Sequence, residues 1–197
     1  MPRIVAGAAR GRRLAEAPEG TRPTADRAKE GLFSSLESRF GVEGRHVLDL
    51  YAGSGALGLE ALSRGAAEAV LVDSSAAACS VARTNAKAVG LPGALVEQED
   101  VFAYLRRAPR GRFDMVLVDP PYDVRASTVR KVLAALEPVL ADVAVVAVER
   151  RAADEETTWP EGFTPTGQKM KKRTYGIARM DVAVFERAER RARVPLN

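Results

Sequence analysis

Short apolar runs alternate with amphipathic stretches through most of this chain of 197 residues. The alternating pattern predicts a strand at 46–51, a helix at 56–64, and then strand 69–73, helix 75–89, strand 94–98, helix 101–107, strand 113–118, helix 125–140 and strand 143–149. Parallel strands need a long crossover connection, which is usually a helix. The alternation therefore predicts an α/β fold, a mostly parallel twisted sheet with helices on both faces.

The two ends of the chain depart from this alternation. Residues 1–15 predict a short β-hairpin, and a helix is expected from Thr24, a suitable N-cap, to about Phe40. Residues 162–187 lack a helical period and predict an antiparallel strand pair around Thr174-Tyr175-Gly176. We expect three parts: a basic N-terminal extension (1–40) packed on the core, one α/β domain (41–187) and a basic C-terminal tail (188–197).

A stiff acidic loop follows one of the predicted strands. The apolar run Phe113–Val118 leads directly into Asp119-Pro120-Pro121-Tyr122. Proline has no N–H to extend a ladder, so the chain leaves the sheet at Asp119. Ligands in open α/β sheets bind at the carboxyl ends of the strands, so this loop lies at the expected site. The alternative is an ordinary turn with an aspartate at a strand end.

A glycine-rich bend lies upstream, between a strand and a helix. Gly53-Ser54-Gly55-Ala56-Leu57-Gly58 satisfies the dinucleotide pattern G-x-G-x-x-G, and Asp73 ends the next strand, where an acid accepts ribose hydroxyls. These residues are compatible with an NAD-binding domain.

Two features favour S-adenosylmethionine over NAD. Asp49 precedes the glycine bend, and its carboxylate repels a pyrophosphate but suits a ligand with an ammonium or sulfonium charge. The Asp119–Tyr122 loop also has no evident role in hydride transfer. We therefore predict that Asp73 binds the adenosine part of the ligand and that Asp49, Gly53 and Gly55 lie near its cationic end.

These motifs together resemble a known family. Asp49-Leu50-Tyr51-Ala52-Gly53-Ser54-Gly55 and Asp119–Tyr122 resemble class I S-adenosylmethionine-dependent methyltransferases that act on exocyclic amines. The whole chain resembles the bacterial 16S ribosomal RNA guanine-N2 methyltransferases. Further segments support the narrower resemblance: Arg3–Gly7, Arg10–Leu14, Arg22-Pro23-Thr24, Leu32-Phe33, Glu60–Ala66, Asn85 and Tyr175-Gly176. Tyr51 and Asp73 stand where the family more often has Phe and Glu.

The resemblance implies a Rossmann-like fold and roles for individual residues. Asp119 and the Pro120 carbonyl accept the two amine hydrogens, and Tyr122 stacks on the base; these are the candidate catalytic residues. Asp100, with Val101, resembles the family's contact to the adenine edge, although it also suits the N-cap of the following helix. Thr24 belongs to a segment that resembles one closing over the cofactor, although by spacing alone it is only a turn before a helix.

Basic residues gather near both ends of the chain. The net charge is +4 and the isoelectric point near 9.4. Arg10, Arg12 and Arg13 form one candidate RNA-binding cluster, and Lys171, Lys172 and Arg173 form another. Clusters of one sign indicate an electrostatic surface for polyphosphate if they meet in space. For the arginines of the C-terminal tail we favour solvated surface charge. The implied partner is 16S ribosomal RNA or the small ribosomal subunit, bound by a monomer.

Other classes of protein are disfavoured. A single cysteine and a single histidine argue against a disulfide and a zinc site, and no apolar run reaches the ~20 residues of a membrane span. A cytoplasmic enzyme without a metal is expected. Two alternatives stay open: an N6-adenine or N4-cytosine methyltransferase that uses the same loop, and a non-catalytic RNA-binding or ribosome-assembly protein on the same fold.

Overall fold

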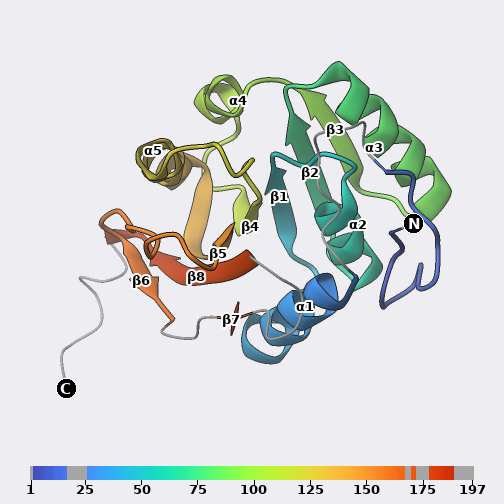
Figure 1. Cartoon of the computed structure of the whole chain (residues 1–197), viewed down its shortest axis with the longest axis horizontal. Coiled ribbons are helices and arrows are strands. Elements are labelled where there is room, and N and C mark those ends of the chain that lie inside the picture. Colours follow the sequence, from blue (N-terminus) through green and yellow to red (C-terminus); the bar gives the residue numbers. More distant parts are fainter. Residues whose placement is uncertain (1, 17–25, 167–169, 172–177, 189–197) are drawn as a thin grey trace.

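The computed structural model describes residues 2–16, 26–166, 170–171 and 178–188 (Figure 1). Its helices are α1 (Asp26–Phe40), α2 (Ala56–Ser63), α3 (Ala76–Val89), α4 (Val101–Arg107) and α5 (Ala126–Leu136), followed by the 3₁₀ turn η1 (Glu137–Val139). Its strands are β1 (His46–Leu50), β2 (Glu68–Asp73), β3 (Ala94–Gln98), β4 (Phe113–Val118), β5 (Leu140–Arg151), β6 (Phe163–Pro165), β7 (Met170–Lys171) and β8 (Ala178–Glu186).

The strands form one mixed sheet in the order β3-β2-β1-β4-β5-β8-β6. β1 to β5 are mutually parallel, and β8 runs antiparallel to β5. The predicted Rossmann-like fold is confirmed. The chain builds outward from β1 in one direction and from β4 in the other, so the crevice between β1 and β4 is the topological switch point at which such sheets bind ligands.

Alternating side chains of the strands fill two separate cores. Val47, Leu71 and Leu117 pack with α1, α2 and α3, whereas Leu48 and Val116 pack with α4 and α5. Figure 1 shows α4 and α5 on one side of the sheet and α2 and α3 on the other. Strands buried on both faces appear in the sequence as unbroken apolar runs, which is why they could be predicted well.

The N-terminal segment forms the short antiparallel hairpin we expected: the N–H of Ile4 donates to the carbonyl of Arg12 at 2.9 Å, and the N–H of Leu14 to that of Pro2 at 2.8 Å. It contains one antiparallel bridge, between Arg3 and Arg13. The N–H groups of Val5 and Ala6 donate to the Glu60 carboxylate of α2, at 2.8 and 3.0 Å, and so do not extend a ladder. Because a helix side chain takes these donors, the hairpin has a single bridge and is docked on α2.

A buried network of charges holds this docked segment. The Lys29 side chain on α1 is fully buried and donates to the carbonyl of Arg3 at 2.5 Å, while its Nζ lies 4.0 Å from Glu60 Oε2. Arg64 Nε donates to Glu60 Oε1 at 2.9 Å. Glu60 is therefore the acceptor that joins α1, α2 and the N-terminal segment.

The C-terminal antiparallel pair lies within the expected residues but is less regular than expected. β6 and β7 both pair with β8. Pro165 and Met170 are five residues apart, but their partners Ala183 and Met180 are only three apart. The expected first strand is therefore split into two pieces by extra residues, while the predicted turn at 174–176 lies outside the described residues.

Two other element ends differ from the expectation. The helix expected over 125–140 ends at Leu136, where η1 begins with Pro138 near its start. Pro138 has no N–H to donate to the carbonyl four residues earlier, so the α-helical hydrogen bonding ends and η1 takes its place. β5 then begins at Leu140, three residues before the expected start. α1 begins at Asp26, and Thr24, its expected N-cap, lies outside the described residues.

Candidate active site at the carboxyl edge of the sheet

Acidic side chains line the carboxyl edge of the sheet on one face. Leu50 pairs with Val72 and with Val118, and Val118 pairs with Val148. The residues that follow these three valines are Asp73 on β2, Asp119 after β4 and Glu149 on β5. Because successive strand side chains alternate, the three acids project away from the α4–α5 core, which the valines fill, toward the face of α1 to α3.

The glycine bend is built by backbone conformations that few residues adopt. Tyr51 has φ 61°, Gly53 φ 55° and Gly55 φ 78°, and Gly55 is the N-cap of α2 in the left-handed region. The N–H of Ala52 donates to the carbonyl of Val72 at 3.0 Å, and the N–H of Gly53 to Asp73 Oδ2 at 2.9 Å. The bend is therefore fixed to the end of β2.

Gly58 explains the third glycine of the pattern. A Cβ at Gly58 would lie 2.1 Å from Leu71 Cδ2 and 3.2 Å from Asp49 Oδ2. Only glycine lets α2 approach β1 and β2 this closely, a packing role that glycine has in dinucleotide folds as well.

Asp49 is almost fully buried beneath the bend, with 1% of its surface exposed. Its Oδ2 accepts the N–H of Gly58 at 2.9 Å, but Oδ1 accepts no hydrogen bond from the part of the chain that the structure describes. Burial raises the pKa of Asp49 to about 7, against the lowering effect of the Gly58 hydrogen bond, and Asp73 raises it further. A buried acceptor of this kind suits a nearby cation, which stabilises its charged form.

Asp73 and Asp100 each bind backbone N–H groups. Asp73 is half-buried; besides Gly53 it accepts the N–H of Ser75 at 2.9 Å, so it joins the glycine bend to the start of α3. Asp100 is exposed and caps α4 by accepting from Phe102 at 3.0 Å and Ala103 at 3.1 Å. The helix-cap role of Asp100 is confirmed, and contacts of Asp73 and Asp100 to a cofactor stay predictions.

The Asp119–Tyr122 loop leaves the sheet as expected. The N–H of Asp119 donates to the carbonyl of Leu50 at 3.2 Å and so extends the β1–β4 ladder by one residue. Asp119 and Tyr122 are half-buried and Pro120 is buried. The ladder places Asp119 next to the glycine bend after β1. The candidate methyl-acceptor loop and the candidate cofactor loop therefore follow neighbouring strands at the switch point.

Tyr122 has two neighbours from β5 that the sequence did not single out. Its hydroxyl donates to Glu149 Oε1 at 3.4 Å, and the guanidinium carbon of Arg151 lies 4.9 Å from its ring centroid. Glu149 carries the same signal as Asp73 and Asp119, an acid that directly follows a buried apolar strand run. This pattern could have identified Glu149 as a candidate site residue.

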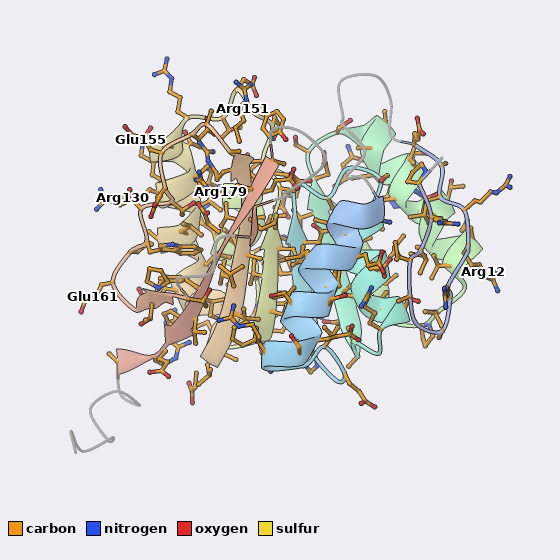
Figure 2. All side chains as sticks on the ribbon, turned by 60° about the horizontal axis from the view of Figure 1, so that its bottom comes forward. Arg12, Arg130, Arg151, Glu155, Glu161 and Arg179 are labelled. Carbon is orange, nitrogen blue, oxygen red and sulfur yellow. The ribbon has the colours of Figure 1, made fainter. Side chains whose placement is uncertain are left out.

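A buried ion pair on β8 holds the chain after Arg151. Arg179 and Asp181 pair at 2.8 Å, and Arg179 also donates to the carbonyls of Asp154 and Glu155, each at 2.9 Å. Figure 2 shows Arg179 close to Arg151 and Glu155. This loop is thus anchored to the strand next to β5, which keeps Arg151 near Tyr122.

The two predicted basic clusters differ in what the structure describes. Arg10, Arg12 and Arg13 are exposed, and Arg12 Nη1 donates to the carbonyl of Ala88 at the end of α3, at 2.7 Å. Figure 2 shows Arg12 on the opposite side of the molecule from Arg151. Lys172 and Arg173 lie outside the described residues, and for Lys171 only its pairing in β7 is described. Whether the clusters form one surface stays a prediction.

One polar side chain connects the N-terminal segment with the glycine bend. Asn85 on α3 is buried; its Oδ1 accepts the N–H of Ala15 at 2.7 Å, and its Nδ2 donates to the carbonyls of Ala15 and Ser54 at 3.0 and 2.9 Å. The segment that carries the arginines is therefore fixed to the glycine bend, the candidate cofactor loop.

The described residues contain no group of three or more His, Cys, Asp or Glu side chains arranged to hold a metal ion. None of the described helices is both long and apolar enough to cross a membrane.

Comparisons with known proteins find a matching family and similar solved structures. The family described as conserved hypothetical protein 95 matches residues 2–184. Ribosomal RNA small subunit methyltransferase D of Escherichia coli (strain K12) is 35% identical over 173 residues, which cover 85% of this chain and 84% of that protein. The solved structure of Escherichia coli yhhF has a TM-score of 0.79 at 32% identity and covers 94% of this chain and 98% of that chain.

A more distant likeness extends to the magnesium protoporphyrin IX methyltransferase of Synechocystis PCC 6803, solved with bound SAM. Its TM-score is 0.62 at 15% identity, over 81% of this chain and 79% of that chain. At this identity the likeness supports the fold alone.

Proposed function

The chain belongs to the ribosomal RNA small subunit methyltransferase D family, also described as conserved hypothetical protein 95, and from that premise we propose that it methylates the exocyclic N2 amine of a guanine in 16S ribosomal RNA. The observation that carries the proposal is the position of Asp119, held beside the glycine bend by its hydrogen bond to Leu50 at 3.2 Å. The methyl donor is S-adenosylmethionine, and the enzyme acts in the cytoplasm as a monomer.

The residues around the glycine bend fit this cofactor. When bound, S-adenosylmethionine supplies an activated methyl group on a sulfonium, so the protein needs neither a nucleophile nor a metal. Asp49 has one buried oxygen that no described residue satisfies, as expected of an acid near a cationic ligand. A Cβ at Gly53 would have no atom within 4 Å, so this position leaves room beside the bend, whereas a Cβ at Gly55 would lie 2.9 Å from Leu71 Cδ1. In our proposal Asp73 binds ribose and Asp100 contacts the adenine edge. Thr24, which lies outside the described residues, belongs to a segment proposed to close over the cofactor.

Asp119 and Pro120 prepare the amine of the base for attack. The exocyclic nitrogen of guanine shares its lone pair with the ring and is a poor nucleophile. The Asp119 carboxylate and the Pro120 carbonyl accept its two hydrogens, which draws the nitrogen toward tetrahedral geometry and aims its lone pair at the methyl carbon. With S-adenosylmethionine bound, the cofactor would supply the methyl group, and Asp119 or water would take the proton that the nitrogen gives up.

Tyr122 holds the base once it has left its RNA stack. An aromatic platform stabilises an unstacked base by about 1–3 kcal/mol. Arg151 covers one face of the ring at 4.9 Å, so the base stacks on the other face or takes the place of the guanidinium. Both arrangements keep a cation close to an RNA substrate.

The basic clusters supply the long-range attraction to RNA. Arg10, Arg12 and Arg13 lie on the N-terminal extension that Asn85 fixes near the glycine bend. Lys171 lies in β7, and Lys172 and Arg173, the other members of the second cluster, lie outside the described residues. We propose the same division as the sequence suggests, with residues 1–40 and the final strand pair guiding RNA toward a catalytic core over 41–187.

The test is to map the methylated base. Small ribosomal subunits that lack the modification are incubated with the protein and labelled S-adenosylmethionine, and the label should appear at N2 of one guanine of 16S ribosomal RNA. Asp119→Ala should lower the rate about 100-fold or more, in the range for loss of a group that acts in the transition state. Its affinity for the cofactor should change little.

Asp123→Ala is the matched control, because Asp123 is an exposed acid on the same loop, and it should keep nearly full activity. Label on adenine N6 or cytosine N4 would contradict the proposed guanine substrate and support the alternative substrates. Cofactor binding without transfer to any base would favour a non-catalytic assembly protein.

A further inference from the structure

Glu149 is a buried acid at the site that the mechanism above does not use. It follows the apolar run Ala144–Val148 of β5 and is 7% exposed. Its neighbour in the sheet register is Asp119, because Val118 pairs with Val148 one step earlier. Its Oε1 accepts the Tyr122 hydroxyl at 3.4 Å, so the side chain faces the loop that holds the base.

The order of the strands places Glu149 on the side of Asp119 that faces away from the cofactor. Across the sheet lie Asp73 on β2, the glycine bend after β1, Asp119 after β4 and then Glu149 on β5. The cofactor side of Asp119 is thus taken by the glycine bend. A base whose amine binds Asp119 therefore extends its remaining edge toward β5. Glu149 is within reach of that edge, because adjacent strands lie only about 4.8 Å apart.

We propose that Glu149 selects guanine by accepting its N1–H while Asp119 accepts the neighbouring N2 amine; the inference rests on the function proposed above. N1 and N2 of guanine are bonded to the same ring carbon, so their hydrogens point along the same edge. A carboxylate only accepts hydrogen bonds, and it has two oxygens to do so. In this arrangement Glu149 Oε1 keeps the Tyr122 hydroxyl and Oε2 accepts from the base edge.

The same carboxylate rejects the other bases that carry exocyclic amines. Adenine and cytosine present a ring nitrogen acceptor, not a donor, beside the amine. Two acceptors that face each other in a buried site leave both groups unsatisfied and repel. A site built to pair with a donor discriminates strongly against an analogue that lacks it. Glu149 therefore separates guanine from the substrates of enzymes that use the same Asp-Pro-Pro-Tyr loop.

A simpler role for Glu149 is to orient Tyr122 through the hydroxyl. The two roles predict different behaviour of base analogues. If Glu149 acted only through Tyr122, removing the hydroxyl would mimic removing the carboxylate. If Glu149 contacts the base, the two changes would differ in their effect on base preference.

The experiment compares guanine with 2-aminopurine at the methylated position of the RNA. 2-Aminopurine keeps the N2 amine but has an unprotonated N1 acceptor. The wild-type protein should favour guanine in kcat/KM by at least about 10- to 100-fold, the scale of a hydrogen bond to a charged group. Glu149→Gln can donate to the N1 acceptor through its amide and should reduce this preference at least about tenfold.

Tyr122→Phe is the matched control. It removes the hydroxyl that Glu149 contacts but keeps the ring, and it should leave the guanine to 2-aminopurine ratio within about twofold of wild type. The proposal is overturned by equal wild-type rates on the two bases, by an unchanged ratio in Glu149→Gln, or by an equal shift in Tyr122→Phe.

Equal wild-type rates on the two bases would overturn the proposal even if Glu149→Gln does not fold. Failure of the underlying function looks different, because the wild-type protein would then transfer no methyl group to the guanine RNA at all.

Discussion

At the scale of single residues, Asp49 shows how one buried carboxyl links the cofactor site to stability. Among the described residues its burial is offset only by the Gly58 hydrogen bond at 2.9 Å, and its pKa is raised to about 7 chiefly by desolvation. The folded protein therefore binds a proton at Asp49 that the unfolded chain, with an aspartate pKa near 3.9, releases at lower pH. The free energy of unfolding without ligand should therefore depend on pH between the unfolded and the folded pKa of Asp49.

The sign of the effect is set by the raised pKa. The stabilising contribution is full below about pH 4 and is lost as the pH rises through about 7, by at most about 1.4 kcal/mol per pH unit. Asp49→Asn keeps the shape and cannot ionise, so its free energy of unfolding should fall less than that of wild type between pH 4 and 7. Chemical denaturation of both proteins over this range measures the difference.

At pH 7, added S-adenosylmethionine should bring the fall in the free energy of unfolding of wild type closer to that of Asp49→Asn. The reason is that a cation near Asp49 favours the ionised form of its carboxyl. Parallel pH profiles for wild type and Asp49→Asn would show that Asp49 is not the titrating group.

At the scale of elements, the N-terminal segment and α2 form one unit through Glu60. Four groups depend on this carboxylate: the N–H groups of Val5 and Ala6, Arg64 Nε and the buried Lys29 ammonium. Arg64 also pairs with Glu37, whose side chain is 43% exposed. The same arginine thus has one buried and one exposed acidic partner, which allows a direct comparison.

Glu60→Ala should destabilise the protein by about 3–5 kcal/mol, because it leaves buried charges and donors uncompensated. Glu37→Ala should cost less than about 1 kcal/mol, as exposed ion pairs do. Urea denaturation of the two variants measures both values. Similar small losses for both would mean that the docking of residues 2–16 does not depend on Glu60.

At the scale of the whole molecule, the site lies between the N-terminal extension and the loop after β5. Arg12 and Arg151 mark opposite sides of the molecule in Figure 2, and the sheet edge with Asp119 belongs to the strands between them. An RNA that reaches Asp119 from both sides must span a considerable surface. This arrangement suits a large folded substrate better than a free nucleotide.

Replacing Arg10 and Arg13 together by alanine should weaken RNA binding without changing cofactor affinity. Each phosphate that is no longer neutralised should lower the slope of log affinity against log salt by roughly 0.7–0.9. Arg12 is left in place because its hydrogen bond to Ala88 holds the segment on α3. Binding to 16S ribosomal RNA is measured over a salt series for Arg10→Ala with Arg13→Ala.

The control is Arg106→Ala with Arg130→Ala, two exposed arginines on α4 and α5. Its slope should stay close to that of wild type. Equal slopes for both double variants would indicate a diffuse attraction in place of an RNA surface on the N-terminal extension.

The sequence alone determined the parallel core and located the glycine bend and the strand-end acids of the candidate site. Strands buried on both faces need unbroken apolar runs, and Asp49, Asp73 and Asp119 stand out because an acid is costly in or beside such a run. The glycines at 53, 55 and 58 mark the bend by local conformation and close packing. Each of these signals lies within one short segment, so no knowledge of distant contacts is needed to find it.

Only the tertiary structure decided what depends on register and docking. Glu149 lies far along the chain from Asp119, and only the β4–β5 pairing makes them neighbours. The N-terminal hairpin is limited to one bridge because the next donor, the N–H of Val5, binds Glu60, more than fifty residues away. The split of the edge strand into β6 and β7 likewise depends on its pairing with β8. Such contacts are set by the packing of whole elements, and local sequence carries no record of which distant group will accept a hydrogen bond.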